Sequence, residues 1–340
     1  MVDFLDRKIL SFYKSKKVLV SGAAGYIAWN LINKLSGIDC EITCLTRKPL
    51  NELYMANFEK CKAQINTIVG SYDDETLWKQ SMDGIDIVFH LAAQTSFYKA
   101  EEDPLEDFNS NVYPMQLLLK AVSQNEKKPY VAFAGSVTQC GLTKKLPVGE
   151  SVNDNPSTIY DFHKLLAESY LKFYINKNLV HGTCLRLSNV YGPGPKSSSD
   201  DKGILHSMIR KALQKEKLTI YGTGDFIRDY TFIDDVVNAF LACPCNLKRT
   251  NGNYYIVGSG KGYSVKEAIN MVARVVERIT SLKVNVISVE SPDGLLDIEY
   301  RNFIADNSNL KLDTGWFANT DLEEGIFKTV NKIRSNNLFF

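Results

Sequence analysis

The sequence lacks an excess of charge of either sign: 40 lysines and arginines face 39 aspartates and glutamates over 340 residues. A neutral balance gives no reason to expect duplex nucleic acid or a membrane surface as a partner. There is also no apolar run of membrane-spanning length, and residues 1–17 alternate charged and hydrophobic residues without a signal-peptide core. We therefore expect no nucleic-acid partner and no membrane partner.

A disulfide framework is also missing. The seven cysteines are odd in number and are scattered through expected strands and helices, which indicates a reducing, cytoplasmic location. The pair Cys243 and Cys245 has no second cysteine or histidine pair downstream that would complete a zinc site, so we expect no metal. The other cysteines are Cys40, Cys44, Cys61, Cys140 and Cys184.

Short apolar runs alternate with segments of helical periodicity over the first two thirds of the chain. Several runs are apolar throughout, as parallel strands covered on both faces are. This alternation predicts an α/β fold, a Rossmann-type doubly wound parallel sheet. The expected strands lie within residues 18–20, 40–47, 86–93, 130–136 and 181–192, and one expected helix spans 112–122.

A glycine-rich turn joins the first strand to the first helix. Residues 22–28 read GAAGYIA, which fits the pattern G-x-x-G-x-x-(G/A) of a dinucleotide-binding turn. Glycines allow the backbone to approach a pyrophosphate closely, and the helix N-terminus offers free N–H groups to it. A tight turn without a ligand is the alternative. The predicted cofactor contacts here are Gly22, Ala24, Gly25, Tyr26 and Ile27.

The end of the second strand bears on the choice of cofactor. An NAD site usually places an acid there, whereas an arginine suits the 2′-phosphate of NADP. The strand ends in Thr46, Arg47 and Lys48, with no acid. The Arg47 guanidinium could grip a phosphate, so NADP(H) is favoured and NAD(H) remains the alternative. Arg47 and Lys48 could otherwise be solvated loop cations.

The segment IYDFHK places Tyr160 and Lys164 one helical turn apart on one face. The pair is either a surface feature or a phenol whose acidity is tuned by a neighbouring ammonium. The spacing alone leaves both interpretations open.

In order along the chain, several segments together resemble the extended short-chain dehydrogenase/reductase family of nucleotide-sugar epimerases, dehydratases and reductases. The resemblance runs from about Lys17 to the C-terminus. The segments are the glycine turn, FHLAAQTS (89–96), the helix segment carrying Asn111, Ser136, Tyr160 with Lys164 and then Glu168, RLSNVYGPG (186–194), IYGTGDFIRDYTFIDDVVNAF (220–240), and the closing segment 303–326.

The resemblance implies a catalytic set of Ser136, Tyr160 and Lys164. Tyr160 would exchange a proton with the sugar while hydride moves to or from the nicotinamide, and Lys164 would lower the phenol's pKa and hold the nicotinamide ribose. Ser136 would hydrogen-bond the reacting sugar oxygen. Further cofactor contacts are expected at Leu91, Ala92, Ala93 and Asn111.

A nucleotide-diphosphate sugar is the implied substrate. Arg228 and Asn189 are the expected diphosphate contacts, although Arg228 could instead form an internal ion pair with Asp229. The usual late arginine is missing, and Arg301 either replaces it or is a surface residue. The full set of expected substrate contacts is Gln94, Ser136, Val137, Asn189, Leu218, Tyr221, Arg228 and Arg301.

These parts predict a smaller C-terminal α/β substrate lobe with helical stretches near 204–215, 264–280 and 321–334. The predicted division is an N-terminal extension (1–16), an NAD(P)-binding Rossmann domain (17–190, with 229–258) and a substrate-binding lobe (191–228 and 259–340). By the same resemblance, the helices bearing Asn111 and Tyr160 pack against their copies in a homodimer.

The family's dehydratases carry acids directly after the catalytic serine, where this chain has Val137 and Thr138. Neither side chain titrates usefully, which disfavours dehydration by the usual route. The activity expected first is a nucleotide-sugar 4-epimerase, and the alternative is an NADPH-dependent 4-keto-6-deoxy-sugar 4-reductase. A further alternative is a non-catalytic dinucleotide sensor on the same fold.

Overall fold

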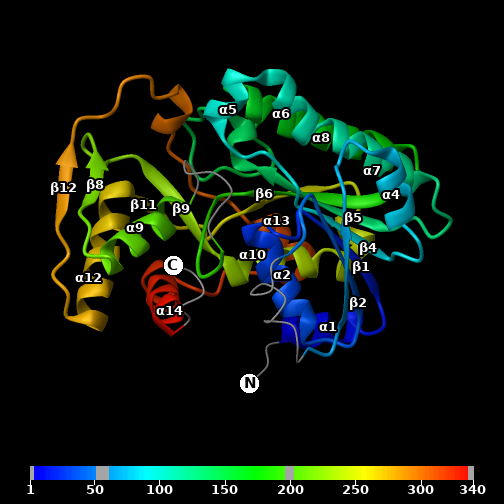
Figure 1. The fold of residues 1–340 in the computed structure, drawn as a ribbon. Helices are drawn as coiled ribbons and strands as arrows, with labels where there is room; N and C mark the ends of the chain where they lie inside the picture. The colour runs from blue at the N-terminus through cyan, green and yellow to red at the C-terminus, as the bar shows by residue number, and fades with distance from the viewer. Residues whose placement is uncertain (1–3, 51–60, 196–202, 336–340) are drawn as a thin grey trace.

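The computed structural model describes residues 4–50, 61–195 and 203–335. Its core is a seven-stranded sheet of order β10-β6-β5-β4-β1-β2-β3, in which all neighbouring strands are parallel (Figure 1). This order continues the 3-2-1-4-5-6 arrangement of a doubly wound dinucleotide fold, so the predicted fold class is confirmed. The strands are β1 (Lys17–Ser21), β2 (Glu41–Thr46), β3 (Gln64–Val69), β4 (Ile87–His90), β5 (Tyr130–Ser136), β6 (His181–Leu187) and β10 (Tyr254–Val257).

The helices form a layer on each face of this sheet (Figure 1). One layer contains α4 (Glu75–Ser81), α5 (Phe97–Glu102), α6 (Pro104–Asn111), α7 (Tyr113–Ser123) and α8 (Ile159–Asn176). The other contains α1 (Phe4–Tyr13), α2 (Tyr26–Ser36) and α10 (Ile233–Ala242). The central strand β4 is buried at every residue because both of its faces are covered.

The N-terminal helix α1 packs on the body of the protein through its apolar face. Ile9 and Tyr13 are fully buried, and the Tyr13 hydroxyl donates a hydrogen bond to the carbonyl of Leu241 at the end of α10 (3.1 Å). Part of the segment that alternates charged and hydrophobic residues therefore forms a helix, which joins the main hydrophobic core.

Two smaller sheets lie at the side of the central sheet (Figure 1). One has the order β11-β9-β7 and the other pairs β12 with β8. The elements of this region are β7 (Asn189–Tyr191), α9 (Ile204–Leu213), β8 (Leu218–Tyr221), β9 (Ile227–Phe232), β11 (Gly262–Ser264), α12 (Val265–Thr280), β12 (Val286–Val289) and α14 (Leu322–Ser335). The remaining short elements are η1 (Val137–Cys140), η2 (Pro244–Asn246), α11 (Leu247–Thr250), η3 (Asp297–Tyr300) and α13 (Ser308–Thr314). The exact domain boundaries stay a prediction.

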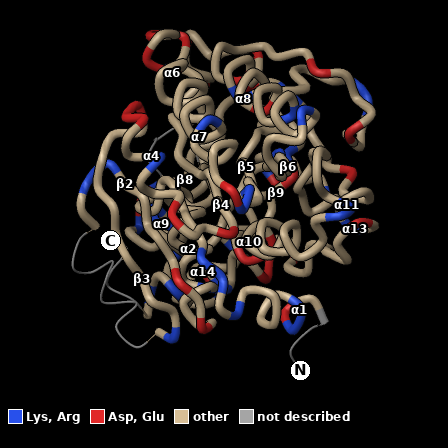
Figure 2. The backbone as a smooth tube through the Cα atoms, turned by 90° about the vertical axis from the view of Figure 1, so that its right-hand side faces the viewer, with Lys and Arg blue, Asp and Glu red and all other residues tan. Residues whose placement is uncertain are grey.

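Acidic and basic residues are interspersed along the chain rather than segregated (Figure 2). Over the described ranges, no helix is long and apolar enough to cross a membrane. All seven cysteines are free, and five of them are buried. A cytoplasmic location stays a prediction.

Candidate active site

The glycine turn at residues 22–25 lies against the loop after β4. Gly22 has φ of +71°, and a Cβ on it would lie 2.7 Å from the backbone nitrogen of Ala92. Any side chain at this position would therefore push the two loops apart. Gly25 is the N-cap of α2 and offers no side-chain cap, so the first amides of the helix, those of Tyr26 and Ile27, lack a capping side chain. An uncapped helix start of this kind suits a pyrophosphate.

Arg47 is exposed directly after β2, at the edge where the adenosine end of a dinucleotide would lie. The hydroxyl of Tyr72 accepts a hydrogen bond from the amide of Gly22 (2.8 Å) and donates one to the carbonyl of Leu45 (3.0 Å). Burial raises the pKa of Tyr72 to about 12, and its contact with Gly22 and the charge of Arg47 oppose that shift. Tyr72 thus fastens the glycine turn to the end of β2.

Gln94 and Asn111 form one hydrogen-bonded cluster with Asp107 and His163. Asp107 accepts hydrogen bonds from Gln94 (2.7 Å) and Asn111 (2.9 Å), and its other oxygen contacts His163 Nδ1 at 2.7 Å. The Gln94 side chain also donates a hydrogen bond to the carbonyl of Ser96 and accepts one from the amide of Ser96. Its predicted substrate contact would require some of these bonds to break. In contrast, Asn111 Oδ1 is buried and has no partner within the described residues, which fits a cofactor contact.

Tyr160 and Lys164 lie on the first two turns of α8, and both are buried, with exposed fractions of 6% and 2%. The surface-pair interpretation is therefore wrong. The Tyr160 ring packs edge-on against Phe97 (centroids 5.3 Å apart), and Lys164 Nζ lies 4.2 Å above the centre of the Phe133 ring. Burial lowers the pKa of Lys164 to about 8, opposed by Cys184, Asp107 and Glu168. A buried ammonium of this kind stabilises an anion placed beside it.

Ser136 ends β5 and is the N-cap of η1, where Ser136 and Gln139 form a reciprocal capping box. Its Oγ lies 2.7 Å from Thr138 Oγ1, and Thr138 in turn donates a short hydrogen bond to the carboxylate of Asp161. Asp161 follows Tyr160 directly and is fully buried. The site thus holds a carboxylate one hydroxyl away from Ser136, which sequence reasoning missed because Asp161 is separated from Thr138 by more than twenty residues of chain.

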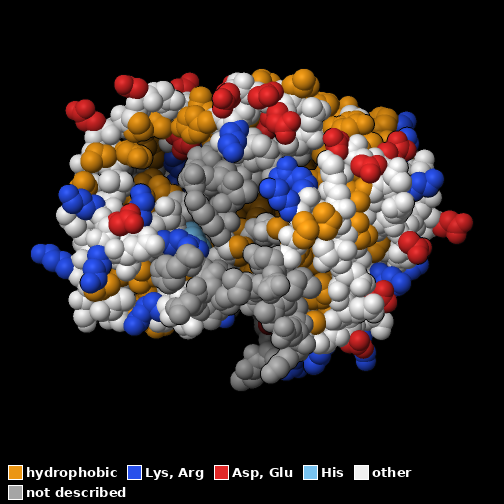
Figure 3. All heavy atoms as spheres, viewed as in Figure 1, with side chains coloured by type: hydrophobic (Ala, Val, Ile, Leu, Met, Phe, Trp, Pro, Cys, Tyr) orange, Lys and Arg blue, Asp and Glu red, His pale blue; other side chains and the backbone are white. Residues whose placement is uncertain are grey.

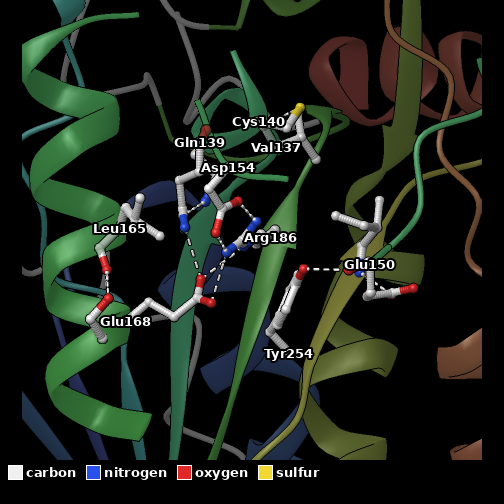
Figure 4. Close-up of polar contacts among 12 residues, drawn as sticks. Val137, Gln139, Cys140, Glu150, Asp154, Leu165, Glu168, Arg186 and Tyr254 are labelled. Carbon is white, nitrogen blue, oxygen red and sulfur yellow. Dashed lines mark hydrogen bonds and ion pairs between the residues drawn. The ribbon is translucent and has the colours of Figure 1, made fainter. Parts of the chain in front are cut away.

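Gln139 connects the end of β5 to a buried ion cluster (Figure 4). Its amide oxygen accepts from the Ser136 backbone (2.8 Å), and its amide nitrogen donates to Glu168 (2.8 Å). Glu168 binds Arg186 through two hydrogen bonds of 2.8 Å, and Arg186 also pairs with Asp154. Glu168 is therefore linked through Gln139 to the backbone of Ser136, the expected catalytic serine.

Three predicted diphosphate contacts, Asn189, Arg228 and Arg301, are brought together from distant segments. The Arg228 guanidinium donates to the backbone carbonyls of Ile227, Glu299 and Arg301, and an Arg301 nitrogen lies 3.4 Å from Asn189 Oδ1. Burial and the charge of Arg301 lower the pKa of Arg228 to about 10.

The structure contradicts two alternatives: an ion pair between Arg228 and Asp229, and a surface position for Arg301. The contacts of Asp229 are the amides of Ser259, Gly260 and Ala305 rather than the guanidinium of Arg228. Arg301 is buried, with an exposed fraction of 9%, so it is not a surface residue. Its Nε is buried without a partner in the described part of the chain. Two buried cations held by neutral carbonyls form a natural site for an anion.

The remaining predicted contacts divide by exposure. Val137 and Leu218 are buried, at 3% and 0%, so Leu218 offers a ligand no exposed surface in this structure. Tyr221, at the end of β8, is half exposed. Leu91 and Ala93 are partly buried, Ala92 is buried, and Ala24 is exposed at the glycine turn. Among residues 4–50, 61–195 and 203–335, no cluster of histidine, cysteine, aspartate or glutamate could hold a metal ion.

Comparison with known proteins gives the same family as the site. The chain is 26% identical to a putative UDP-glucose 4-epimerase of Methanocaldococcus jannaschii, over 94% of this chain and 99% of that one. It is 25% identical to a dTDP-4-dehydro-6-deoxyglucose reductase of Escherichia coli, over 93% and 97%. The crystal structure of the UDP-glucose 4-epimerase of Thermotoga maritima with UDP-glucose superposes with a TM-score of 0.82 at 25% identity, covering 94% of this chain and 99% of that one. Residues 18–258 match the model of one family, and the chain belongs to it: the NAD dependent epimerase/dehydratase family.

Proposed function

We propose that this protein is a nucleotide-sugar 4-epimerase in which Tyr160 exchanges a proton with the sugar's C4 oxygen. The observation that carries the proposal is the buried pair of Tyr160 and Lys164 on α8, beside the end of β5 that presents Ser136. A sensor that only bound a dinucleotide would have no use for a buried tyrosine one helical turn from that lysine. The 4-epimerases among its relatives support the same assignment.

The chemistry follows from the charges of these residues. A nicotinamide held in this site would supply the hydride acceptor and donor for sugar C4. Lys164 favours the phenolate form of Tyr160, which accepts the proton of the C4 hydroxyl and later gives it back. Ser136 hydrogen-bonds the same oxygen and fixes its direction. The sugar must turn over between the two transfers, while its diphosphate stays held by Asn189, Arg228 and Arg301.

The glycine turn, the uncapped start of α2 and the unpartnered Asn111 oxygen fit a dinucleotide cofactor. The family is described as NAD dependent. Arg47 supports a finer proposal, a preference for NADP(H), because an exposed guanidinium at the end of β2 attracts a 2′-phosphate and no acid there opposes it. The same arginine and the E. coli relative favour the second candidate, a 4-ketoreductase that consumes NADPH.

The first test is to purify the protein without added cofactor, denature it, and identify the released dinucleotide by mass spectrometry. An epimerase recycles its cofactor, so we expect close to one dinucleotide per chain, and NADP⁺ if Arg47 selects it. Released NAD⁺ would keep the epimerase and overturn the argument from Arg47. An empty site that binds NADPH far better than NADH would instead favour the reductase.

We also propose that the protein is a homodimer formed through α6 and α8. Hydrophobic atoms are exposed over these helices (Figure 3). Leu105 on α6 is 69% exposed, and Phe162 and Phe173 on α8 are 51% and 56% exposed. A face carrying three large apolar side chains is costly in water and typical of an interface.

The dimer is tested by light scattering at micromolar concentration. We expect the mass of two chains for the wild type and of one chain for Leu105→Glu, because a charge would be buried without a partner. The matched control is Leu312→Glu, since Leu312 on α13 is equally exposed at 73% but lies away from this face. A wild-type monomer would contradict the proposal.

A further inference from the structure

Asp107 lies at the centre of a buried hydrogen-bonded cluster that joins α6 to α8. Its Oδ1 accepts hydrogen bonds from the side-chain amides of Gln94 (2.7 Å) and Asn111 (2.9 Å), and its Oδ2 lies 2.7 Å from Nδ1 of His163. Asp107, Asn111 and His163 are all buried. Because these polar groups are removed from water, they depend on one another for their hydrogen bonds.

Backbone groups fix the orientation of the two amides. The Ser96 amide can only donate, and it contacts Gln94 Oε1, so the nitrogen of the Gln94 side chain is the atom that faces Asp107. The Gln94 carbonyl can only accept, and it contacts the Asn111 side-chain nitrogen at 3.1 Å. Both hydrogens of that nitrogen are therefore engaged, one by Gln94 and one by Asp107. These assignments hold whichever of Asp107 and His163 carries the proton between them.

The side-chain oxygen of Asn111 is the one atom of this amide that the cluster does not use. Oδ1 is buried and has no partner within residues 4–50, 61–195 and 203–335. Turning the amide over would bring this oxygen against two acceptors, the Gln94 carbonyl and Asp107 Oδ1, so the cluster disfavours that alternative. A buried acceptor without a partner is costly, which points to a hydrogen-bond donor supplied by a ligand.

The unpaired oxygen belongs to the reacting end of the candidate site. Asp107 contacts His163, and the next residue of α8 is Lys164. Burial lowers the pKa of Lys164 to about 8, and Cys184, Asp107 and Glu168 oppose that shift. The nicotinamide half of a dinucleotide offers donors of the required kind, namely ribose hydroxyls and carboxamide N–H groups. The adenosine half would lie instead at the end of β2.

We infer that Asp107 and His163 are positioning residues, which hold the Asn111 amide so that its oxygen is free to accept a hydrogen bond from the nicotinamide half of the cofactor. The inference rests on the proposed function, which places a dinucleotide in this site. His163 fixes the carboxyl group of Asp107, and Asp107 fixes the amide of Asn111. The His163 ring is held in turn by Phe108 on α6 (centroids 5.7 Å apart) and Phe162 on α8 (6.0 Å). Sequence reasoning identified Asn111 but neither of the two residues behind it.

The test measures binding rather than turnover, on full-length proteins freed of bound dinucleotide. NADH and NADPH are titrated by fluorescence, and ADP, which carries only the adenosine half, is measured by its competition with the tighter of the two. His163→Phe keeps a ring between Phe108 and Phe162 and removes Nδ1. We expect the dissociation constant of the dinucleotide to rise about three- to tenfold, the effect of one hydrogen bond, and that of ADP to change less than about twofold.

Three further variants separate positioning from packing. His163→Asn offers an amide N–H near the position of Nδ1 and should bind the dinucleotide nearly as well as the wild type. Asn111→Leu removes the acceptor itself. The double variant Asn111→Leu/His163→Phe should bind no more weakly than Asn111→Leu alone, because His163 acts through Asn111. His163→Leu removes Nδ1 with a smaller side chain, which keeps the test valid if the larger ring prevents folding.

The matched control is His181→Leu. His181 is the first residue of β6 and pairs with Tyr130 at the start of β5, whereas Ser136 ends that strand. The control therefore removes a histidine at the opposite edge of the sheet from the candidate site, and it should bind both the dinucleotide and ADP as the wild type does.

Unchanged dinucleotide binding in His163→Phe and His163→Leu would overturn the inference and leave the epimerase proposal standing. An equal loss of ADP binding, or a loss that His163→Asn does not recover, would also overturn it, because either would indicate general damage to packing. Additive losses in the double variant would show that His163 does not act through Asn111. A wild type that binds neither NADH nor NADPH would overturn the proposed function, and this inference with it.

Discussion

Replacing Tyr160 by phenylalanine is expected to lower turnover by about 10²- to 10⁴-fold, the usual contribution of a general acid–base group. The substitution removes one oxygen from a ring that stays packed against Phe97, so the fold and the cofactor site should persist. The measurement pairs steady-state epimerisation with cofactor affinity from titration. We expect kcat to fall and the affinity for the dinucleotide to change little.

The control for this variant is Tyr170→Phe. Tyr170 lies on the same helix, is partly buried, and packs against the hydrophobic cluster beneath α7 and α8. It should retain wild-type turnover. If Tyr160→Phe kept wild-type activity as well, Tyr160 would not be the proton-transfer group, and the proposed mechanism would be wrong.

Most of the central sheet could be predicted because its strands are covered on both faces. β5 was predicted at its observed bounds, Tyr130–Ser136, since an unbroken apolar run has few other interpretations. β3 was not among the predicted strands. It is an edge strand, and four of its six residues, Gln64–Val69, are exposed, so its sequence carries too little hydrophobic signal.

Sequence reasoning could propose site residues where a single segment carries their chemistry. The glycine turn and the pair of Tyr160 and Lys164 each lie on one continuous stretch of chain. Spacing within one segment can be recognised from the sequence alone. Asp161 lies between Tyr160 and Lys164 in the sequence, but nothing in that segment indicates that it contacts Thr138. The sequence likewise offered Arg301 as either a phosphate contact or a surface residue, because only tertiary packing buries it beside Arg228.

The ion cluster behind Ser136 is expected to be the most costly polar feature of the protein to break. Glu168 and Arg186 are 0% and 1% exposed, and the guanidinium also stacks 3.9 Å from the centre of the Tyr254 ring (Figure 4). Burial raises the pKa of Glu168, but the hydrogen bonds and charge of Arg186 outweigh it and lower this pKa to about 2. Removing Arg186 would leave a buried carboxylate without its main partner.

We expect Arg186→Met to lower the free energy of unfolding by about 3 to 5 kcal/mol, measured by urea denaturation at neutral pH. Lys328→Met is the control, because Lys328 pairs with Glu324 across one turn on the solvent-facing side of α14, and its loss should cost less than about 0.5 kcal/mol. The double variant Glu168→Leu/Arg186→Met removes both charges and should recover part of the loss. Equal destabilisation by Arg186→Met and the control would show that the cluster contributes no more than a surface pair.

The same cluster predicts a dependence of stability on pH. Because the pKa of Glu168 is lower in the folded protein than the usual value near 4.3 of an exposed glutamate, its contribution is complete above that value. It is then lost as the pH falls towards about 2, where the folded carboxylate takes up its proton.

Glu168→Gln should be less stable at neutral pH and should lose less stability than the wild type between pH values of about 4.3 and 2. Parallel stability curves for the two proteins over that range would contradict the assigned pKa.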